Sequence, residues 1–134
     1  MTEYDTTGAQ AGHPNDSRLL QALPAAAFAV DVDGRLLFWN DAAERLFGFE
    51  ASRVIGQSLD VIIPEHLRAP HWCGYQRAMA TGKTKHAGRP TLTKALHRSG
   101  ETHYVEMSFA VVADSAESVV GSVAIARAAN FPDR

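Results

Sequence analysis

Three side chains that bind metals or act as nucleophiles lie close together in the chain: His66, His71 and Cys73. Imidazole and thiolate are common ligands of transition metals, and a bare metal ion needs several of them at one point. The mixed spacings do not put all three on one helix face, and no CxxC pair or second cysteine is present. The sequence therefore does not indicate a zinc site. His97 and His103 flank a predicted hairpin turn, and we interpret both as structural.

No motif of an enzyme active site is present. The chain contains no GxSxG, no P-loop, no HExxH and no dinucleotide fingerprint, and no base is identifiable as a partner of Cys73. We therefore expect a protein that is not an enzyme. His71 remains as a candidate ligand residue, because a neutral imidazole can donate one lone pair to iron while its other nitrogen is oriented by a hydrogen bond.

Composition limits the classes of partner. The chain has 134 residues, of which 46% are hydrophobic and 21% are charged, and this is material for one domain. Thirteen basic and 15 acidic residues give a formal charge of −2 without a Lys/Arg cluster, so nucleic-acid binding is disfavoured. Because no signal peptide or long apolar run is present, we expect a cytoplasmic protein without a membrane partner, and the single cysteine agrees with a reducing compartment.

The termini differ from the rest of the chain. Apart from Met1, residues 1–16 contain Tyr4 as their only large apolar side chain, so we expect a flexible N-terminal arm. Residues 17–128 form the predicted domain, and residues 129–134 form a C-terminal tail. The domain begins with a short helix over residues 18–23.

A hairpin follows the short helix. The apolar runs 25–30 and 35–39 predict two paired strands. Asp33-Gly34 between them predicts a tight turn in which both central residues adopt positive φ.

The middle of the chain is helical. Asn40 is predicted to cap a helix over residues 41–47. Breaks in the pattern between residues 49 and 64 favour one or two single-turn helices. A longer helix is predicted over residues 70–80, with Pro70 either at its start or kinking an earlier turn over residues 65–69.

From Gly88 onward the apolar pattern has a period of two. It predicts three antiparallel strands over residues 91–97, 102–112 and 119–128. We expect one face of the middle strand to point into the core: His103, Val105, Met107, Phe109 and Val111. The elements together predict an α+β domain, a five-stranded antiparallel sheet with helices covering one face.

Several short motifs, in this order along residues 17–128, closely resemble those of a PAS domain. They are Asp31-Val32-Asp33-Gly34-Arg35, the run from Trp39 to Phe49, Ile55-Gly56, Ile63-Pro64, Thr81-Gly82, Gly88-Arg89 and the run from His97 to Glu101. The resemblance implies the PAS fold and a sensory or interaction module whose sheet and helices can enclose a ligand.

The resemblance also implies a cofactor. The heme-binding members of the family, oxygen-sensing histidine kinases among them, carry the histidine that holds the heme iron on the helix predicted here over residues 70–80. His71 occupies the matching position, four residues before Tyr75. We therefore expect heme b, bound through His71, and a diatomic gas or the redox state as the signal.

Three further residues resemble the gas-binding side of such a pocket. Arg89 resembles the arginine that reaches over the heme to a bound gas or a propionate, although its spacing from His71 is shorter. Arg89 could instead stand where other members have a methionine ligand, or lie on the surface. Met107 and Phe109 resemble the apolar lining positions. A guanidinium can donate a hydrogen bond to bound oxygen while apolar walls exclude water.

Two other functions stay open. The domain could bind a non-heme small molecule in the same pocket, with His71 and Tyr75 as hydrogen-bonding residues. It could also be a ligand-free module for dimerisation or protein interaction. We expect a homodimer. The short helix over residues 18–23 carries three leucines, Leu19, Leu20 and Leu23, which is more apolar surface than a small solvated helix needs. The cysteine motif of flavin-photoadduct members is absent, and the downstream effector is unknown.

Overall fold

The computed structural model describes residues 16–85 and 88–129 of the chain. The elements follow one another as α1 (Asp16–Ala22), β1 (Ala26–Asp31), β2 (Leu36–Trp39), α2 (Asp41–Phe47), α3 (Ala51–Val54), the 3-10 helix η1 (Leu59–Ile62), α4 (Glu65–Thr81), β3 (Thr91–Leu96), β4 (Thr102–Ala113) and β5 (Val119–Ala128). The arm predicted over residues 1–16 and the tail over 129–134 lie outside the described residues, apart from Asp16 and Ala129.

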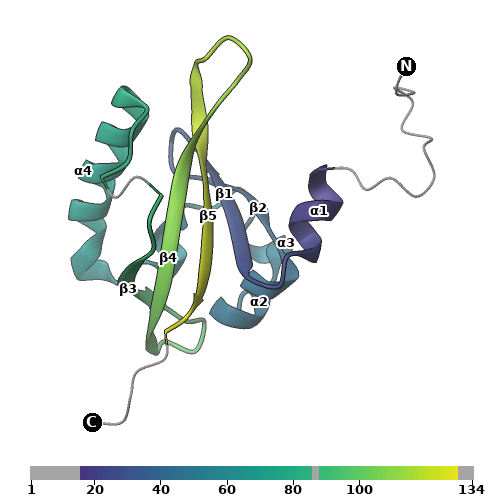
Figure 1. The fold of residues 1–134 in the computed structure, drawn as a ribbon. Helices are drawn as coiled ribbons and strands as arrows, with labels where there is room; N and C mark the ends of the chain where they lie inside the picture. The colour runs from purple at the N-terminus through teal and green to yellow at the C-terminus, as the bar shows by residue number, and fades with distance from the viewer. Residues whose placement is uncertain (1–15, 86–87, 130–134) are drawn as a thin grey trace, which may run out of the picture.

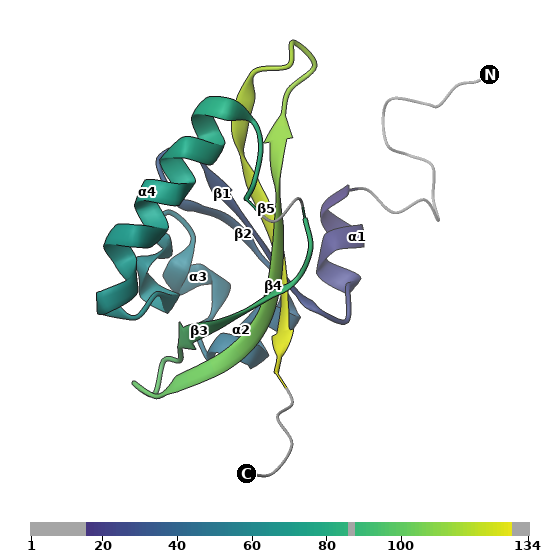
Figure 2. The same ribbon diagram turned by 60° about the vertical axis from the view of Figure 1, so that its left-hand side comes forward.

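The five strands form one antiparallel sheet in the order β2-β1-β5-β4-β3, so the first and last strands of the chain lie side by side (Figure 1). Figure 2 shows α3 and α4 on one side of this sheet and α1 on the other. The predicted fold class is confirmed. No helix in the described residues is both long enough and apolar enough to cross a membrane.

The core lies between the inner face of the sheet and the helices. Alternation along β1 turns Phe28 and Val30 inward, where both are almost completely buried. The ring of Phe28 lies 5.6 Å from that of Trp39 and 6.1 Å from that of Phe47, both measured between ring centroids. Aromatic contacts at these distances add about 0.5–1.5 kcal/mol each beyond area burial. This cluster fixes α2 against the sheet.

The turn between β1 and β2 differs from its prediction. Of the two central residues, Asp33 and Gly34, only Gly34 has a positive φ, at 89°. The prediction of a two-residue turn with two positive φ angles is therefore wrong. The Asp31 carboxylate accepts hydrogen bonds from the amides of Asp33, at 2.9 Å, and Arg35, at 3.0 Å. The amide of Gly34 donates to the Asp31 carbonyl. An aspartate that bonds amides further along the chain supports a wider turn, which starts at Asp31.

Asn40 caps α2 as predicted and also joins two other elements. Its Oδ1 accepts the amide of Ala43 at 2.9 Å, which is the cap, and the amide of Ala27 in β1 at the same distance. Its Nδ2 donates to the carbonyls of Leu20 and Ala25. The side chain is fully buried, and every bond is needed because an unpaired buried polar group is costly.

The long helix α4 begins at Glu65, five residues before Pro70. The prediction that Pro70 starts the helix is therefore wrong. The alternative, in which a helical turn precedes Pro70, gives the correct start of the helix. Proline inside a helix removes one hydrogen bond to the carbonyl four residues earlier, and its ring crowds that carbonyl. Gly82 ends the helix in the left-handed conformation, with φ of 73°.

The inward face of β4 is confirmed for Val105, which is buried, and for Met107 and Phe109, which pack against the core. The predicted inward orientation is wrong for His103, which is exposed. His103 lies at the start of β4, where its ring stacks on that of His97 across the hairpin, 5.1 Å between centroids.

Candidate functional site

A cavity of about 200 Å³ lies between α4 and the inner face of the sheet. Its apolar lining consists of Phe28, Val30, Leu59, Met107, Phe109 and Ala124, and its polar lining consists of His71, Tyr75, Thr91, Thr93 and Ser122. Every strand except β2 contributes to this wall. The cavity is thus built by the same inward alternation that builds the core.

His71 and Tyr75 reach the cavity from the same face of α4, because they are one helical turn apart. Their rings are nearly parallel, with an interplanar angle of 15° and 6.0 Å between centroids. The Tyr75 hydroxyl donates to the carbonyl of Asp31 at 2.7 Å and lies 3.3 Å from Ser122 Oγ. Burial raises the pKa of Tyr75, so its hydroxyl stays protonated and ties α4 to β1.

His71 carries an unpaired polar atom. Its Nδ1 is buried and has no hydrogen-bond partner. Burial lowers the pKa of His71 below its ordinary value of 6.5, and the negative charge of Asp60 partly opposes this. The ring is therefore neutral at neutral pH and keeps a lone pair, which is the form in which imidazole binds metals.

Met107 and Phe109 line the side of the cavity formed by β4. Both are half-buried, and both project from the inner face of the sheet, two residues apart. The Thr91 hydroxyl donates to the carbonyl of Met107 at 3.4 Å, which is a long hydrogen bond between β3 and β4. The apolar side chains thus face the polar ones on α4.

Arg89 is not among the residues that line this cavity. It lies just before β3 and is exposed. The structure therefore brings together four of the five residues that the sequence singled out, namely His71, Tyr75, Met107 and Phe109. What each of them does, Arg89 included, stays a prediction.

Two lining residues could have been found from the sequence. Ser122 alternates with Ala124 and Ala126, which are both buried on the inner face of β5. Thr93 alternates in the same way with Thr91 and Ala95 on β3. Period two alone therefore places both inward. Leu59 lies on the 3-10 helix η1, where no such alternation applies.

Two other features lie outside this site. A larger cavity of about 520 Å³ lies beside α3 and has Arg53 and Arg98 in its wall, where Arg98 Nε donates to the carbonyl of Gly48 at 2.9 Å. Cys73 is exposed on α4. Within residues 16–85 and 88–129, no three His, Cys, Asp or Glu side chains are grouped to hold a metal ion.

Comparison with known proteins gives a consistent result. The family model described as the PAS fold matches residues 15–128. The chain is 29% identical over 90 residues to the sensor protein FixL of Bradyrhizobium diazoefficiens, which is 67% of this chain and 18% of that protein. It is 29% identical over 104 residues to the oxygen sensor protein DosP of Escherichia coli, which is 78% of this chain and 13% of that protein. The chain therefore spans less than a fifth of either relative's length.

A solved structure supports the same fold. The crystal structure of the PAS domain of a protein from Colwellia psychrerythraea superposes with a TM-score of 0.73 at 18% identity. The match covers 84% of this chain and 92% of that one. At this identity the likeness concerns the fold alone.

Proposed function

The chain belongs to the PAS family, and on that premise we propose that it is a sensory domain that binds heme b through His71. The observation that carries the proposal is the neutral imidazole of His71 in the wall of a partly apolar cavity. Similarity to a protein named as an oxygen sensor, DosP, supports a gas as the signal. The similarity to FixL, named as a sensor protein, supports the sensory class.

The residues present fit heme as ligand and lining. A neutral imidazole on α4 is a suitable iron ligand, and Met107 and Phe109 offer an apolar wall opposite it. The volume of about 200 Å³ is smaller than the roughly 300–1,000 Å³ typical of pockets for drug-sized ligands. Heme is at least as large as such ligands, so its binding requires α4 and the sheet to move apart.

Each residue of the site has a distinct part in this proposal. Heme would supply an iron atom that can take up a diatomic gas or change its oxidation state. His71 would hold that iron, and Tyr75 would keep α4 attached to β1 through the Asp31 carbonyl. Met107 and Phe109 would exclude water. Arg89 would have to turn inward from its exposed position to donate a hydrogen bond to a bound gas.

A hemin titration followed by visible absorption tests this function. We expect the wild-type chain to bind hemin in equimolar amount and His71→Ala to lose about two orders of magnitude in affinity or more, since it lacks the bond to iron. His66→Ala is the matched control, because His66 is an exposed histidine on the same helix. Equal hemin affinity in wild type and His71→Ala would overturn the proposal.

The small volume and the polar lining favour a second candidate function. Tyr75, Thr93 and Ser122 line the cavity and carry hydroxyl groups, which suits a small polar molecule. In this case no widening is needed. Native mass spectrometry of the purified chain would then detect an added mass much smaller than that of heme, and this mass would be absent after His71→Ala or Tyr75→Phe.

We also propose that the domain forms a homodimer through α1 and the outer face of the sheet. Leu19 on α1 is 52% exposed, and Ile125 on the outer face of β5 is 45% exposed. Leu92 on β3 and Tyr104 on β4 are also exposed on this face, which carries the Glu106–Arg127 ion pair in register with Leu92. Apolar side chains that are exposed together, and not singly, are typical of a contact surface. The same surface would serve a ligand-free interaction module.

A further inference from the structure

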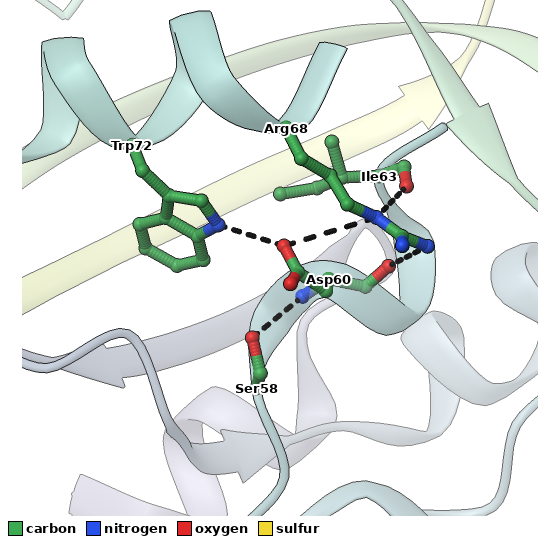
Figure 3. A network of polar contacts seen from close by, with 5 residues as sticks. All are labelled: Ser58, Asp60, Ile63, Arg68 and Trp72. Carbon is green, nitrogen blue, oxygen red and sulfur yellow. Dashed lines mark hydrogen bonds and ion pairs between the residues drawn. The ribbon is translucent and has the colours of Figure 1, made fainter. Parts of the chain in front are cut away.

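The carboxylate of Asp60 meets the indole of Trp72 where η1 lies against α4 (Figure 3). Trp72 Nε1 donates to Asp60 Oδ1 at 2.7 Å, which is short for a nitrogen donor and typical of an ionised acceptor. Neither residue belongs to a site motif in the sequence. They are twelve positions apart and belong to different elements.

Asp60 is itself held in place. Its amide donates to Ser58 Oγ at 3.1 Å, and Arg68 Nη2 donates to its carbonyl at 3.3 Å. Arg68 Nε donates to the carbonyl of Ile63 at 2.9 Å and lies 3.9 Å from Asp60 Oδ1. Figure 3 shows Arg68 and Trp72 reaching from α4 to this one carboxylate. The backbone of Asp60 is thus held by two hydrogen bonds, and its carboxylate, 39% exposed, contacts Trp72 and Arg68.

The indole of Trp72 in turn contacts the residues of the cavity. Its ring meets the His71 ring edge to face, with 4.4 Å between centroids and an interplanar angle of 80°. It meets the Tyr75 ring at 5.4 Å and 89°. On the β1–β2 turn, Gly34 approaches the indole so closely that any Cβ there would overlap it. The indole therefore has little freedom once its N–H is bound.

We propose that Asp60 is a positioning residue for His71: by fixing the Trp72 indole through a hydrogen bond, it fixes the orientation of the His71 ring in the cavity. This inference rests on the proposed function in so far as His71 is the ligand residue. The chain of contacts runs from carboxylate to indole to imidazole and needs no bound group.

Asp60 also acts on His71 through its charge, and this effect must be separated from positioning. The negative charge raises the pKa of His71 against the larger effect of burial. Asp60→Asn removes the charge but keeps an oxygen that can accept the indole N–H. Asp60→Ala removes both. Positioning therefore predicts that Asn preserves the geometry of His71 and that Ala does not.

The first experiment uses the ligand-free chain. In wild type and Asp60→Asn, NMR should detect nuclear Overhauser contacts between the His71 and Trp72 rings, and ring-current shifts of the imidazole protons caused by the indole. In Asp60→Ala these contacts should weaken and the shifts should move toward ordinary values. Unchanged signals in a folded Asp60→Ala would overturn the proposal, and loss of the contacts in Asp60→Asn would attribute the effect to charge and overturn it as well.

The second experiment measures hemin affinity. Asp60→Ala and Trp72→Phe should each weaken hemin binding about tenfold, which is a typical effect of losing a group that orients a metal ligand. The double variant should be no weaker than either single variant, since both act through one hydrogen bond. Additive losses would contradict the proposal. Asp114→Ala is the control, because Asp114 accepts two amides in the β4–β5 turn and has no contact with the cavity.

The two experiments distinguish the two claims. If wild type binds no hemin while the NMR contacts depend on Asp60 as expected, the proposed function fails and the positioning of His71 stands. If hemin binds through His71 but all Asp60 variants behave like wild type in both experiments, the positioning claim fails alone. Thermal unfolding of each variant, followed by circular dichroism, shows which variants are folded and can be compared.

Discussion

At His71, burial does more than the residue type to define the chemistry. An exposed imidazole binds water with both nitrogens and is partly protonated near neutral pH. In this cavity Nδ1 is covered and unpaired, and the pKa of the ring is lowered. An unsatisfied buried nitrogen costs about 1–3 kcal/mol, which a ligand bound to the imidazole would recover in part. Burial thus keeps the imidazole in its neutral form.

This arrangement makes stability depend on pH in a defined direction. Because the folded-state pKa of His71 lies below 6.5, the unfolded chain binds the proton more readily than the folded chain. Protonation of His71 therefore leaves the free energy of unfolding unchanged above about pH 6.5. The free energy of unfolding decreases as the pH falls from there through the folded-state pKa. We expect His71→Gln to remove this part of the pH dependence, as measured by urea unfolding at a series of pH values. A difference in stability between wild type and variant that stays constant across this range would contradict the expectation.

The sequence predicts part of the site at this scale. His71 and Tyr75 are found because residues one helical turn apart share a face, and Met107 and Phe109 are found because a strand alternates. Asp60 and Trp72 are not found, since a hydrogen bond between two elements leaves no periodic signal. Arg89 illustrates the same limit, because the side on which a residue before an edge strand lies is decided by tertiary structure.

At the scale of elements, the β1–β2 turn supports α4. Gly34 and Gly56 both have positive φ, at 89° and 86°, so alanine at either position costs about 1–2 kcal/mol of backbone strain. Only at Gly34 would the added Cβ overlap the Trp72 ring, whereas nothing lies within 4 Å of it at Gly56. Gly34→Ala should therefore destabilise the chain more than Gly56→Ala, and it should also weaken hemin binding.

Denaturant unfolding and hemin titration of the two glycine variants check this prediction. Gly56→Ala serves as the control for strain without contact. Equal losses of stability and unchanged hemin affinity in both variants would contradict the role of the turn as a support for Trp72.

Local signals predict the elements better than their ends. Asp33-Gly34 predicts the hairpin correctly, but the Asp31 carboxylate selects a wider turn than two residues. Asn40 predicts the start of α2, and its three further bonds, to Leu20 in α1, to Ala25 just before β1 and to Ala27 in β1, depend on segments that only the folded chain brings near. Pro70 shows the reverse case, in which tertiary packing keeps a helix continuous through a residue that disfavours it.

At the scale of the whole molecule, the two faces of the sheet have different surroundings. The inner face and the helices enclose the cavity, and the outer face and α1 expose apolar side chains. A widening of the cavity moves α4 relative to β1, to which Tyr75 ties it, and β1 is also a strand of the outer face. Ligand binding and dimerisation are therefore expected to be coupled through the sheet.

The dimer can be tested by light scattering at several concentrations. We expect wild type to dimerise, and Leu19→Glu or Ile125→Glu to raise the dissociation constant at least about tenfold, because a charge would be buried in an apolar contact. Ile55→Glu is the matched control, since Ile55 is similarly exposed, at 43%, but follows α3 on the opposite side of the sheet. A wild-type chain that stays monomeric at high concentration would contradict the expectation.

The bond between His71 and heme iron is the central claim, and the resonance Raman spectrum of the reduced, hemin-loaded chain tests it most directly. We predict an iron–histidine stretching band in wild type and in His66→Ala, its loss in His71→Ala, and its return when imidazole is added to His71→Ala. Absence of this band from the loaded wild-type chain, or its persistence in His71→Ala without imidazole, would contradict the assignment of His71 as the heme ligand.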